Sequence, residues 1–279
     1  MLPASQIVLP SLAINHFPVY KMDSTERVDD DNSRPLNVPH VDIVRYGRTF
    51  LRMAVCELRF PTLFELDQPR PPTTFATALR RLYPLHEVAQ TLGLGDADVT
   101  RRMQHEFRTQ AKDWVVTLKQ DAVSLQTSAY TTFEDFLSRL KVVIAAATPV
   151  IDSPFFTRVG LRYVNHLPFR KDELLNDWIN SDLVGALTTG LYGRPHEYLG
   201  RVIGRVGDGQ YVFQHGFKVN EDFVRTPTYA IDCDMSQENV ETQDVATLLP
   251  KLNQHAFNLF HWALGPKAKN SLTSSIERS

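Results

Sequence analysis

The order of the predicted secondary-structure elements constrains this chain most, because strands occur in groups and a long helix follows each group. In the first half, strand patterns cover Thr49–Phe60, Asp113–Lys119 and Ala122–Ser128. A capping pattern at Thr131 and Glu134 then begins an amphipathic helix, which we expect to end at Pro149. Between these elements, we expect residues 85–111 to be partly helical, with Gly93 and Gly95 interrupting the helix.

The second half has elements of the same kind. Its strand patterns cover Tyr198–Val206, Tyr211–Val219 and Tyr229–Met235, and an amphipathic helix follows at about Asp244–Leu264. The strand pattern at Phe155–Leu167 belongs to the first half, where it follows the helix. Grouped strands followed by helices are typical of α+β folds. We therefore predict an α+β fold of antiparallel sheets with long helices packed on one face. It would comprise two roughly similar β-rich halves, each closed by a long helix.

The two ends of the chain differ in composition from its middle. The first 45 residues contain five prolines and the acidic run Asp29–Asp31, and the last 14 residues are mostly small and polar. Such segments bury little apolar surface. We predict an extended or disordered arm over residues 1–45 and a flexible tail over 266–279. A single α+β unit would cover 46–265, with possible halves at 46–168 and 169–265.

Composition excludes several classes of partner. The chain has 30 basic and 32 acidic residues, so a bulk electrostatic partner such as duplex DNA or an anionic membrane is disfavoured. No segment approaches the about 18 consecutive apolar residues of a membrane span, and the first residues lack the basic start of a secretory signal. Cys56 and Cys233 are too few and too far apart for a disulfide framework. We expect a cytoplasmic protein with no membrane association.

The most unusual segment is Arg158–Asn165, with the sequence RVGLRYVN. Strand alternation places Arg158, Gly160 and Arg162 on one face, and Tyr163 and Asn165 on the other. Two guanidiniums on either side of a glycine can bind a carboxylate or a phosphate, and the glycine leaves room for another backbone or a ligand. We predict a ligand or partner site at Arg158, Arg162, Tyr163, Asn165 and Glu57.

A structural alternative exists for the same residues. Glu57 lies mid-strand on the same face as Leu51, Met53 and Val55. A carboxylate among apolar neighbours needs a partner. Arg158 or Arg162 would then form a structural ion pair with Glu57, and the sequence leaves both interpretations open.

Three segments carry a resemblance to a known family. They are AVCELRFP at 54–61, the RVGLRYVN strand, and the late helix with Asn253, His255 and Phe260. Over roughly residues 50–262 the chain resembles a sporadically distributed, uncharacterised bacterial protein family. The resemblance implies a cytosolic bacterial protein of about this size, and the patchy distribution suggests a mobile or defence-linked system. It implies no established reaction.

Few residues carry a pattern typical of catalysis. Asp232 and Asp234 share a strand face and could bind a divalent metal ion, although a solvated outer strand face is the favoured explanation for them. The histidines lack metal-ligand spacing, and no familiar catalytic or phosphate-binding motif is present. We expect no cofactor.

We therefore predict a non-enzymatic binding or regulatory protein that recognises a protein partner or a small anionic ligand, or that forms a homo-oligomer. One alternative is a metal-dependent hydrolase or nuclease that uses Asp232 and Asp234. A second is a single-stranded RNA-binding accessory protein, because Tyr211, Phe213 and Phe217 share a strand face on which bases could stack. The balanced charge disfavours nucleic acid.

Overall fold

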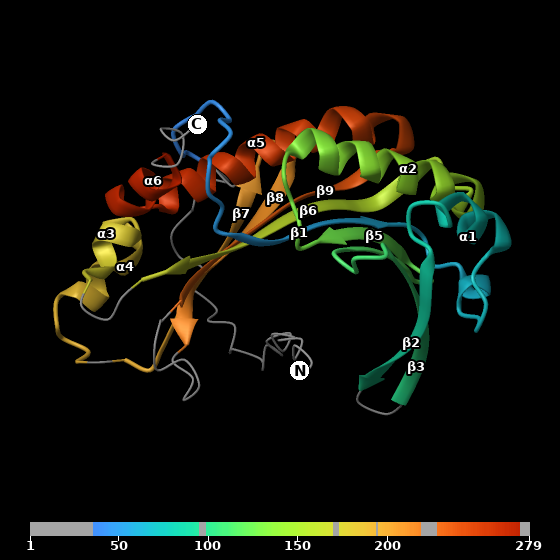
Figure 1. Ribbon diagram of the computed structural model, residues 1–279, viewed down its shortest axis with the longest axis horizontal. Helices are drawn as coiled ribbons and strands as arrows, with labels where there is room; N and C mark the ends of the chain where they lie inside the picture. The colour runs from blue at the N-terminus through green and yellow to red at the C-terminus, as the bar shows by residue number, and fades with distance from the viewer. Residues whose placement is uncertain (1–35, 95–98, 170–172, 194, 219–227, 274–279) are drawn as a thin grey trace, which may run out of the picture. The chain divides into compact units, whose positions relative to one another are not determined.

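One antiparallel sheet of nine strands organises the described part of the chain (Figure 1). The computed structural model describes residues 36–94, 99–169, 173–193, 195–218 and 228–273. The chain divides into the units Met1–Arg34 and Pro35–Ser279. The first unit lies outside the described residues, so the fold below is that of the second.

The strands run in the order β2-β3-β4-β5-β1-β6-β9-β8-β7. Their bounds are β1 Leu51–Arg59, β2 Leu85–Leu94, β3 Val99–Arg108, β4 Trp114–Leu118, β5 Ala122–Thr127, β6 Phe155–Pro168, β7 Glu197–Val206, β8 Gly209–Lys218 and β9 Thr228–Glu241. Strands β1 and β6 form the centre and pair directly, from Leu51 opposite Asn165 to Arg59 opposite Arg158.

Most helices in the described part are short. Only α2 (Phe133–Ile151) and α5 (Val245–Ala263) reach 19 residues. The other elements have eight residues or fewer: α1 Thr73–Leu79, α3 Leu175–Trp178, α4 Ser181–Thr188, α6 Pro266–Thr273 and the 3₁₀ turns η1 Phe64–Leu66 and η3 Thr242–Asp244. None of the described helices combines the length and hydropathy of a membrane-spanning segment.

The predicted fold class was therefore wrong, although the protein is α+β. We expected several sheets in two halves, each closed by long helices, but the structure has one continuous sheet and mostly short helices. The physical reason is the β6–β9 pairing, in which backbone hydrogen bonds join the last strand of the predicted first half to a strand of the predicted second half. Strand alternation identifies the buried face of a strand but not its neighbours.

The helix expected within residues 85–111 was also wrong, because this segment forms the β2–β3 hairpin. On β3, Met103, His105 and Phe107 alternate with polar residues, which is a strand pattern. His105 and Phe107 are buried, and Phe107 lies opposite Val116 of β4. Pairing with neighbouring strands thus determines the strand conformation of this segment, whose sequence pattern alone is weak.

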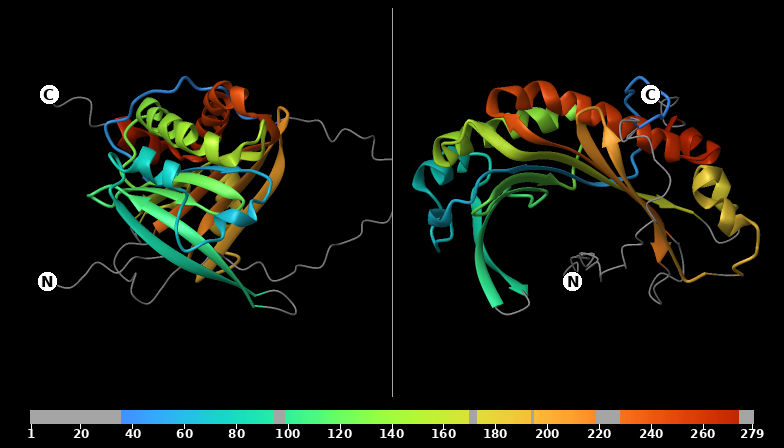
Figure 2. Two further views of the ribbon diagram at one scale, coloured as in Figure 1. Left: turned by 90° about the vertical axis from the view of Figure 1, so that its right-hand side faces the viewer. Right: turned by 180° about the vertical axis from the view of Figure 1, so that it is seen from behind.

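The main core lies between the sheet and the two long helices, which lie on the same face (Figure 1). Alternate residues of the three central strands point toward these helices and are buried: Ala54, Cys56, Leu58, Val159, Leu161, Ile231, Cys233 and Met235. Both cysteines are free thiols. The opposite side of the sheet, which we call the open face, carries the residues between them (Figure 2).

Parts of the predicted arm and tail contact this core. The backbone N–H of Leu36 donates to the carbonyl of Arg205 at 3.1 Å, and the N–H of Val41 donates to Asn258 Oδ1 at 3.1 Å. At the other end, residues 266–273 form α6, in which Ala268 and Leu272 are buried. Residues 1–35 and 274–279 lie outside the described part.

Candidate functional site

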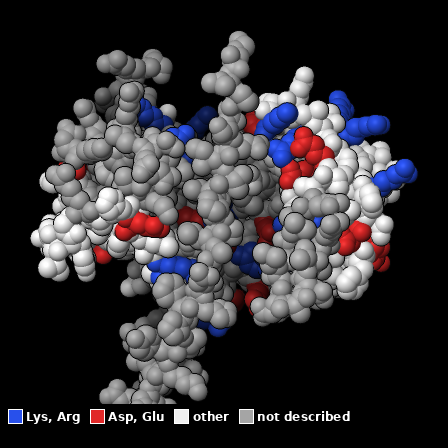
Figure 3. Space-filling model, turned by 90° about the horizontal axis from the view of Figure 1, so that it is seen from below, with Lys and Arg blue, Asp and Glu red and all other residues white. Residues whose placement is uncertain are grey.

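Six charged side chains gather at the centre of the open face, and we call them the central charge network. Three are basic and three acidic: Glu57 and Arg59 on β1, Arg158 and Arg162 on β6, and Asp232 and Asp234 on β9. The strand register brings them together, because Glu57 lies opposite Gly160, and Arg162 lies opposite Asp234. Where described residues are visible from this side, basic and acidic side chains lie next to one another (Figure 3).

One end of the network is the pair Arg162–Asp232. Arg162 donates from Nε to Oδ1 of Asp232 at 2.8 Å and from Nη2 to Oδ2 at 2.6 Å. This two-point geometry is the strongest arrangement of a guanidinium and a carboxylate. The hydrogen bond to Asp232 raises the pKa of Arg162. The Arg162 side chain remains 47% exposed, so the pair can still be reached from solvent.

Arg158 connects the three central strands. Its Nη2 donates to both carboxylate oxygens of Asp234 at 3.0 Å, and its Nη1 lies 3.8 Å from Oε1 of Glu57. Glu57 in turn accepts a hydrogen bond from Nε of Arg59 at 2.7 Å. Burial raises the pKa of Asp234, and the charge of Arg158 opposes that increase. Each carboxylate of the network thus has a guanidinium partner.

Gly160 makes room for the Arg158 guanidinium. A Cβ atom at position 160 would lie 2.4 Å from Nη1 of Arg158 and 2.9 Å from its Cζ. The guanidinium can therefore lie flat over β6 and reach both neighbouring strands. We expected Gly160 to leave room for another backbone or a ligand, but the group that occupies this space is a side chain of the same strand.

The structure divides the predicted binding residues between the two faces. Glu57, Arg158 and Arg162 lie together on the open face, and the structural ion pair between Arg158 and Glu57 is present. Tyr163 and Asn165 are buried on the helix side. The Tyr163 hydroxyl donates to Oδ1 of Asn253 on α5 at 2.8 Å, and burial raises its pKa. These two residues belong to the core.

The predicted metal ligands have other partners. Asp232 pairs with Arg162, and Asp234 pairs with Arg158. Within the described ranges, no group of three or more His, Cys, Asp and Glu side chains is placed to hold a metal ion. A guanidinium beside each carboxylate also opposes the approach of a cation.

The predicted base-stacking residues also pack inside the protein. Tyr211, Phe213 and Phe217 share a face of β8, but Phe213 is buried opposite Cys233, on the side of the long helices. The Tyr211 ring covers Gly204, where an added Cβ would lie 2.7 Å from its hydroxyl oxygen. The described aromatic side chains of β8 therefore do not form a platform on the open face.

A buried histidine lies in the same aromatic cluster. The ring of His215 covers Gly200, where a Cβ would lie 2.2 Å from Nε2. Its Nδ1 lies 2.7 Å from the hydroxyl of Tyr229. Burial lowers the pKa of His215 to about 4, so the ring is neutral at neutral pH.

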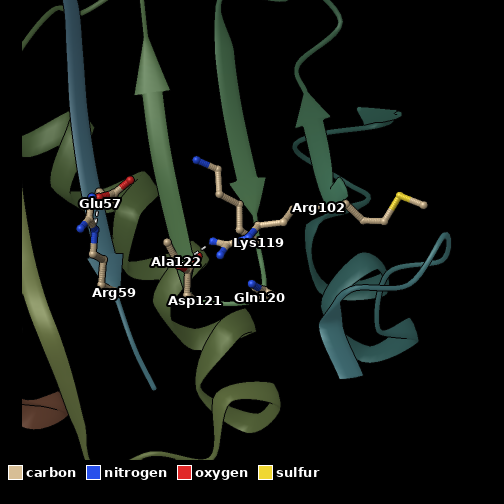
Figure 4. A pocket seen from close by; sticks show the side chains of 8 residues that line it. Glu57, Arg59, Arg102, Lys119, Gln120, Asp121 and Ala122 are labelled. Carbon is tan, nitrogen blue, oxygen red and sulfur yellow. Dashed lines mark hydrogen bonds and ion pairs between the residues drawn. The ribbon is translucent and has the colours of Figure 1, made fainter. Parts of the chain in front are cut away.

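Sequence reasoning missed a cavity of about 230 Å³ beside the network, which we call the turn pocket (Figure 4). Its lining residues are Glu57 and Arg59 from β1, Arg102 and Met103 from β3, Lys119, Gln120 and Asp121 from the β4–β5 turn, and Ala122 at the start of β5. The β3 residues lie in the segment that we expected to be partly helical, so their position beside the turn was not predicted. Alternation of Met103, His105 and Phe107 indicates a strand, but no local pattern shows that this strand lies beside the turn.

Comparisons with known proteins identify no relative. No family model matches the chain, and no curated protein or solved structure shows a significant match. The resemblance to the uncharacterised bacterial family therefore stays a hypothesis.

Proposed function

We propose that this chain is a non-enzymatic binding or regulatory protein that recognises a protein partner through the open face of its sheet. The observation that carries the proposal is the central charge network. It lies on the face opposite α2 and α5, and it holds three guanidiniums in fixed positions against three carboxylates. A cytoplasmic location and a role in a mobile or defence-linked system are part of the proposal and rest on the sequence.

Stability alone does not account for such a network. Ion pairs that stay partly exposed contribute only about 0–1 kcal/mol each, and the Arg162 side chain is 47% exposed. Side chains held in place before binding lose little conformational entropy when a partner arrives. A fixed pattern of charges also selects a partner with the complementary pattern. These properties suit recognition better than they suit folding.

The network favours a protein over a small anion. Arg162 already uses Nε and Nη2 for Asp232, and Arg158 uses Nη2 for Asp234. A free anion would have to displace these carboxylates. The charges of the six groups cancel, so the network has no excess attraction for an anion. A protein surface with mixed charges can pair with both signs at once.

The test is affinity capture of the tagged full-length chain from an extract of its own organism, followed by reconstitution with the purified partner. The informative variant exchanges one ion pair, with Arg162→Asp and Asp232→Arg in the same chain. This exchange keeps the pair but reverses the charges that a partner meets. Lys141→Ala, on the exposed side of α2, is the control for the other face.

We expect wild type and the Lys141 variant to bind the same partner, and the exchanged variant to bind at least tenfold more weakly while remaining folded by circular dichroism. Equal binding by the exchanged variant would show that recognition occurs elsewhere. The proposed function would be contradicted if wild type captured no protein, or if no captured protein bound wild type again after purification.

A further inference from the structure

We infer that the turn pocket is a binding site for a small phosphate group. The site is separate from the protein-recognition role of the open face, although Glu57 and Arg59 belong to both. Three basic side chains line the pocket, Arg59, Arg102 and Lys119, against two acidic ones, Glu57 and Asp121 (Figure 4). The lining therefore carries one excess positive charge.

The acidic side chains of the pocket are already neutralised. Glu57 accepts a hydrogen bond from Arg59 and lies 3.8 Å from Arg158. Asp121 lies 3.9 Å from Nη1 of Arg102. Lys119 differs, because no carboxylate of the described residues forms an ion pair with it. Its ammonium is the charge that an incoming anion would neutralise.

Gln120 supplies a further donor beside Lys119. This residue is only 9% exposed and lines the pocket, yet its side-chain amide makes no hydrogen bond to another side chain or backbone group within the described ranges. A phosphate in the pocket would accept from this amide through one oxygen and from Lys119 through another.

The pocket is built on fixed backbone. Lys119 N–H donates to the carbonyl of Ala122 at 2.8 Å and closes the turn. The segment that follows β1 then holds the turn in place, because Phe60 N–H donates to the carbonyl of Asp121 at 3.0 Å and Leu63 N–H to that of Gln120 at 2.8 Å. The donors are therefore in position before a ligand arrives, which reduces the entropic cost of binding.

Size and charge define the ligand class. The volume of about 230 Å³ is below the roughly 300–1,000 Å³ of sites for drug-sized ligands. Inorganic phosphate or a small phosphomonoester fits this space better than a nucleotide. Lysine, arginine and amide donors are the groups that bind phosphate oxygens. A small dicarboxylate has similar acceptors, so the experiment must separate the two classes.

The experiment is isothermal titration of the full chain with inorganic phosphate at low ionic strength, with succinate as the dicarboxylate. Lys119→Ala and Gln120→Ala are the test variants. Lys141→Ala is the matched control, because it removes the same charge from the exposed side of α2. We expect phosphate to bind wild type and the control alike, and Lys119→Ala at least tenfold more weakly. Gln120→Ala should weaken binding by a smaller factor.

Three outcomes would overturn the inference: no phosphate binding to wild type, equal binding by the Lys119 and Lys141 variants, or tighter binding of succinate than of phosphate. The experiments distinguish a failure of the phosphate site from a failure of the proposed protein recognition. Lys119→Ala should leave capture of a protein partner unchanged, and the exchange of Arg162 and Asp232 should leave phosphate binding unchanged.

Discussion

At the scale of single residues, small side chains determine where large ones lie. Gly160 allows the Arg158 guanidinium to cross β6, and Gly200 allows the ring of His215 to lie over β7. In both positions another side chain of the protein fills the space that the glycine leaves, and neither glycine lies in an unusual turn. The sequence showed these glycines but not the groups that lie over them.

Replacement of Gly160 by alanine should displace the Arg158 guanidinium and separate it from Asp234. A half-buried carboxylate left without its partner costs on the order of 1 kcal/mol or more in the free energy of unfolding, which urea titration would measure. Gly185→Ala is the control, because a Cβ at this helical position meets no atom within 4 Å. Equal effects of the two changes would rule out this role for Gly160.

His215 should make the stability depend on pH. Because burial lowers its pKa to about 4 from the ordinary 6.5, the unfolded state binds the proton more tightly. The contribution of His215 to the free energy of unfolding is therefore complete above about pH 6.5 and is lost as the pH falls toward 4. At ~1.4 kcal/mol for each pH unit, the loss is at most about 3 kcal/mol.

The measurement is urea unfolding from pH 7 down to pH 4.5 for wild type and His215→Gln, which can still bond to Tyr229 but does not titrate. Other buried groups contribute to the wild-type curve, so the difference between the two curves isolates His215. Parallel curves would show that this histidine is not responsible.

At the scale of elements, the periodicity of the sequence predicted where most helices and strands lie, but not which strands pair. The β4–β5 hairpin, the strand of Arg158, the β7–β8 hairpin and both long helices lie close to the ranges expected from the sequence. The β2–β3 hairpin was missed, because Gly93 and the polar residues of β3 obscure its alternation. Strand order was also missed, since period-two alternation is the same whichever neighbour a strand has.

The beginning of α2 gives a test at this scale. We expected Thr131 to be the N-cap, but the Thr132 side chain accepts the N–H of Asp135 at 3.2 Å. Thr132→Ala should cost about 1 kcal/mol in the free energy of unfolding, which is typical of a lost N-cap. Thr131→Ala, one residue earlier, should cost much less. The reverse order in thermal or urea unfolding would place the cap at Thr131.

The candidate site was predictable only in part, for the same reason. Alternation placed Arg158, Arg162 and Glu57 on one face, and it separated them from Tyr163 and Asn165. The partners Asp232 and Asp234 were visible as a pair but not as the partners of the arginines, because that requires the register of β6 against β9. The turn pocket required the position of β3, which no local pattern provided.

At the scale of the whole molecule, one core and one open face result from the single sheet. Cys56 of β1 and Cys233 of β9 both lie in that core and are fully buried. Burial raises the pKa of each thiol, so neither should react while the sheet is intact.

Labelling with a thiol-reactive dye should therefore require opening of the sheet centre. We expect both thiols to be unreactive in native buffer and to react fully in denaturant. In intermediate urea they should react at similar rates, since the same opening exposes both. A thiol that reacts rapidly in native buffer would contradict this description of the core.

The pairing of β1 with β6 also has a consequence for how the chain folds. Strand β1 pairs with β6 about a hundred positions later in the chain, and β6 in turn needs β9, which follows after two more strands. Contacts between distant parts of a chain slow folding, because the intervening loop must close first. An incomplete chain would expose the edge of β6, where aggregation begins most easily. The centre of the sheet should consequently complete its pairing only after β9 has been synthesised.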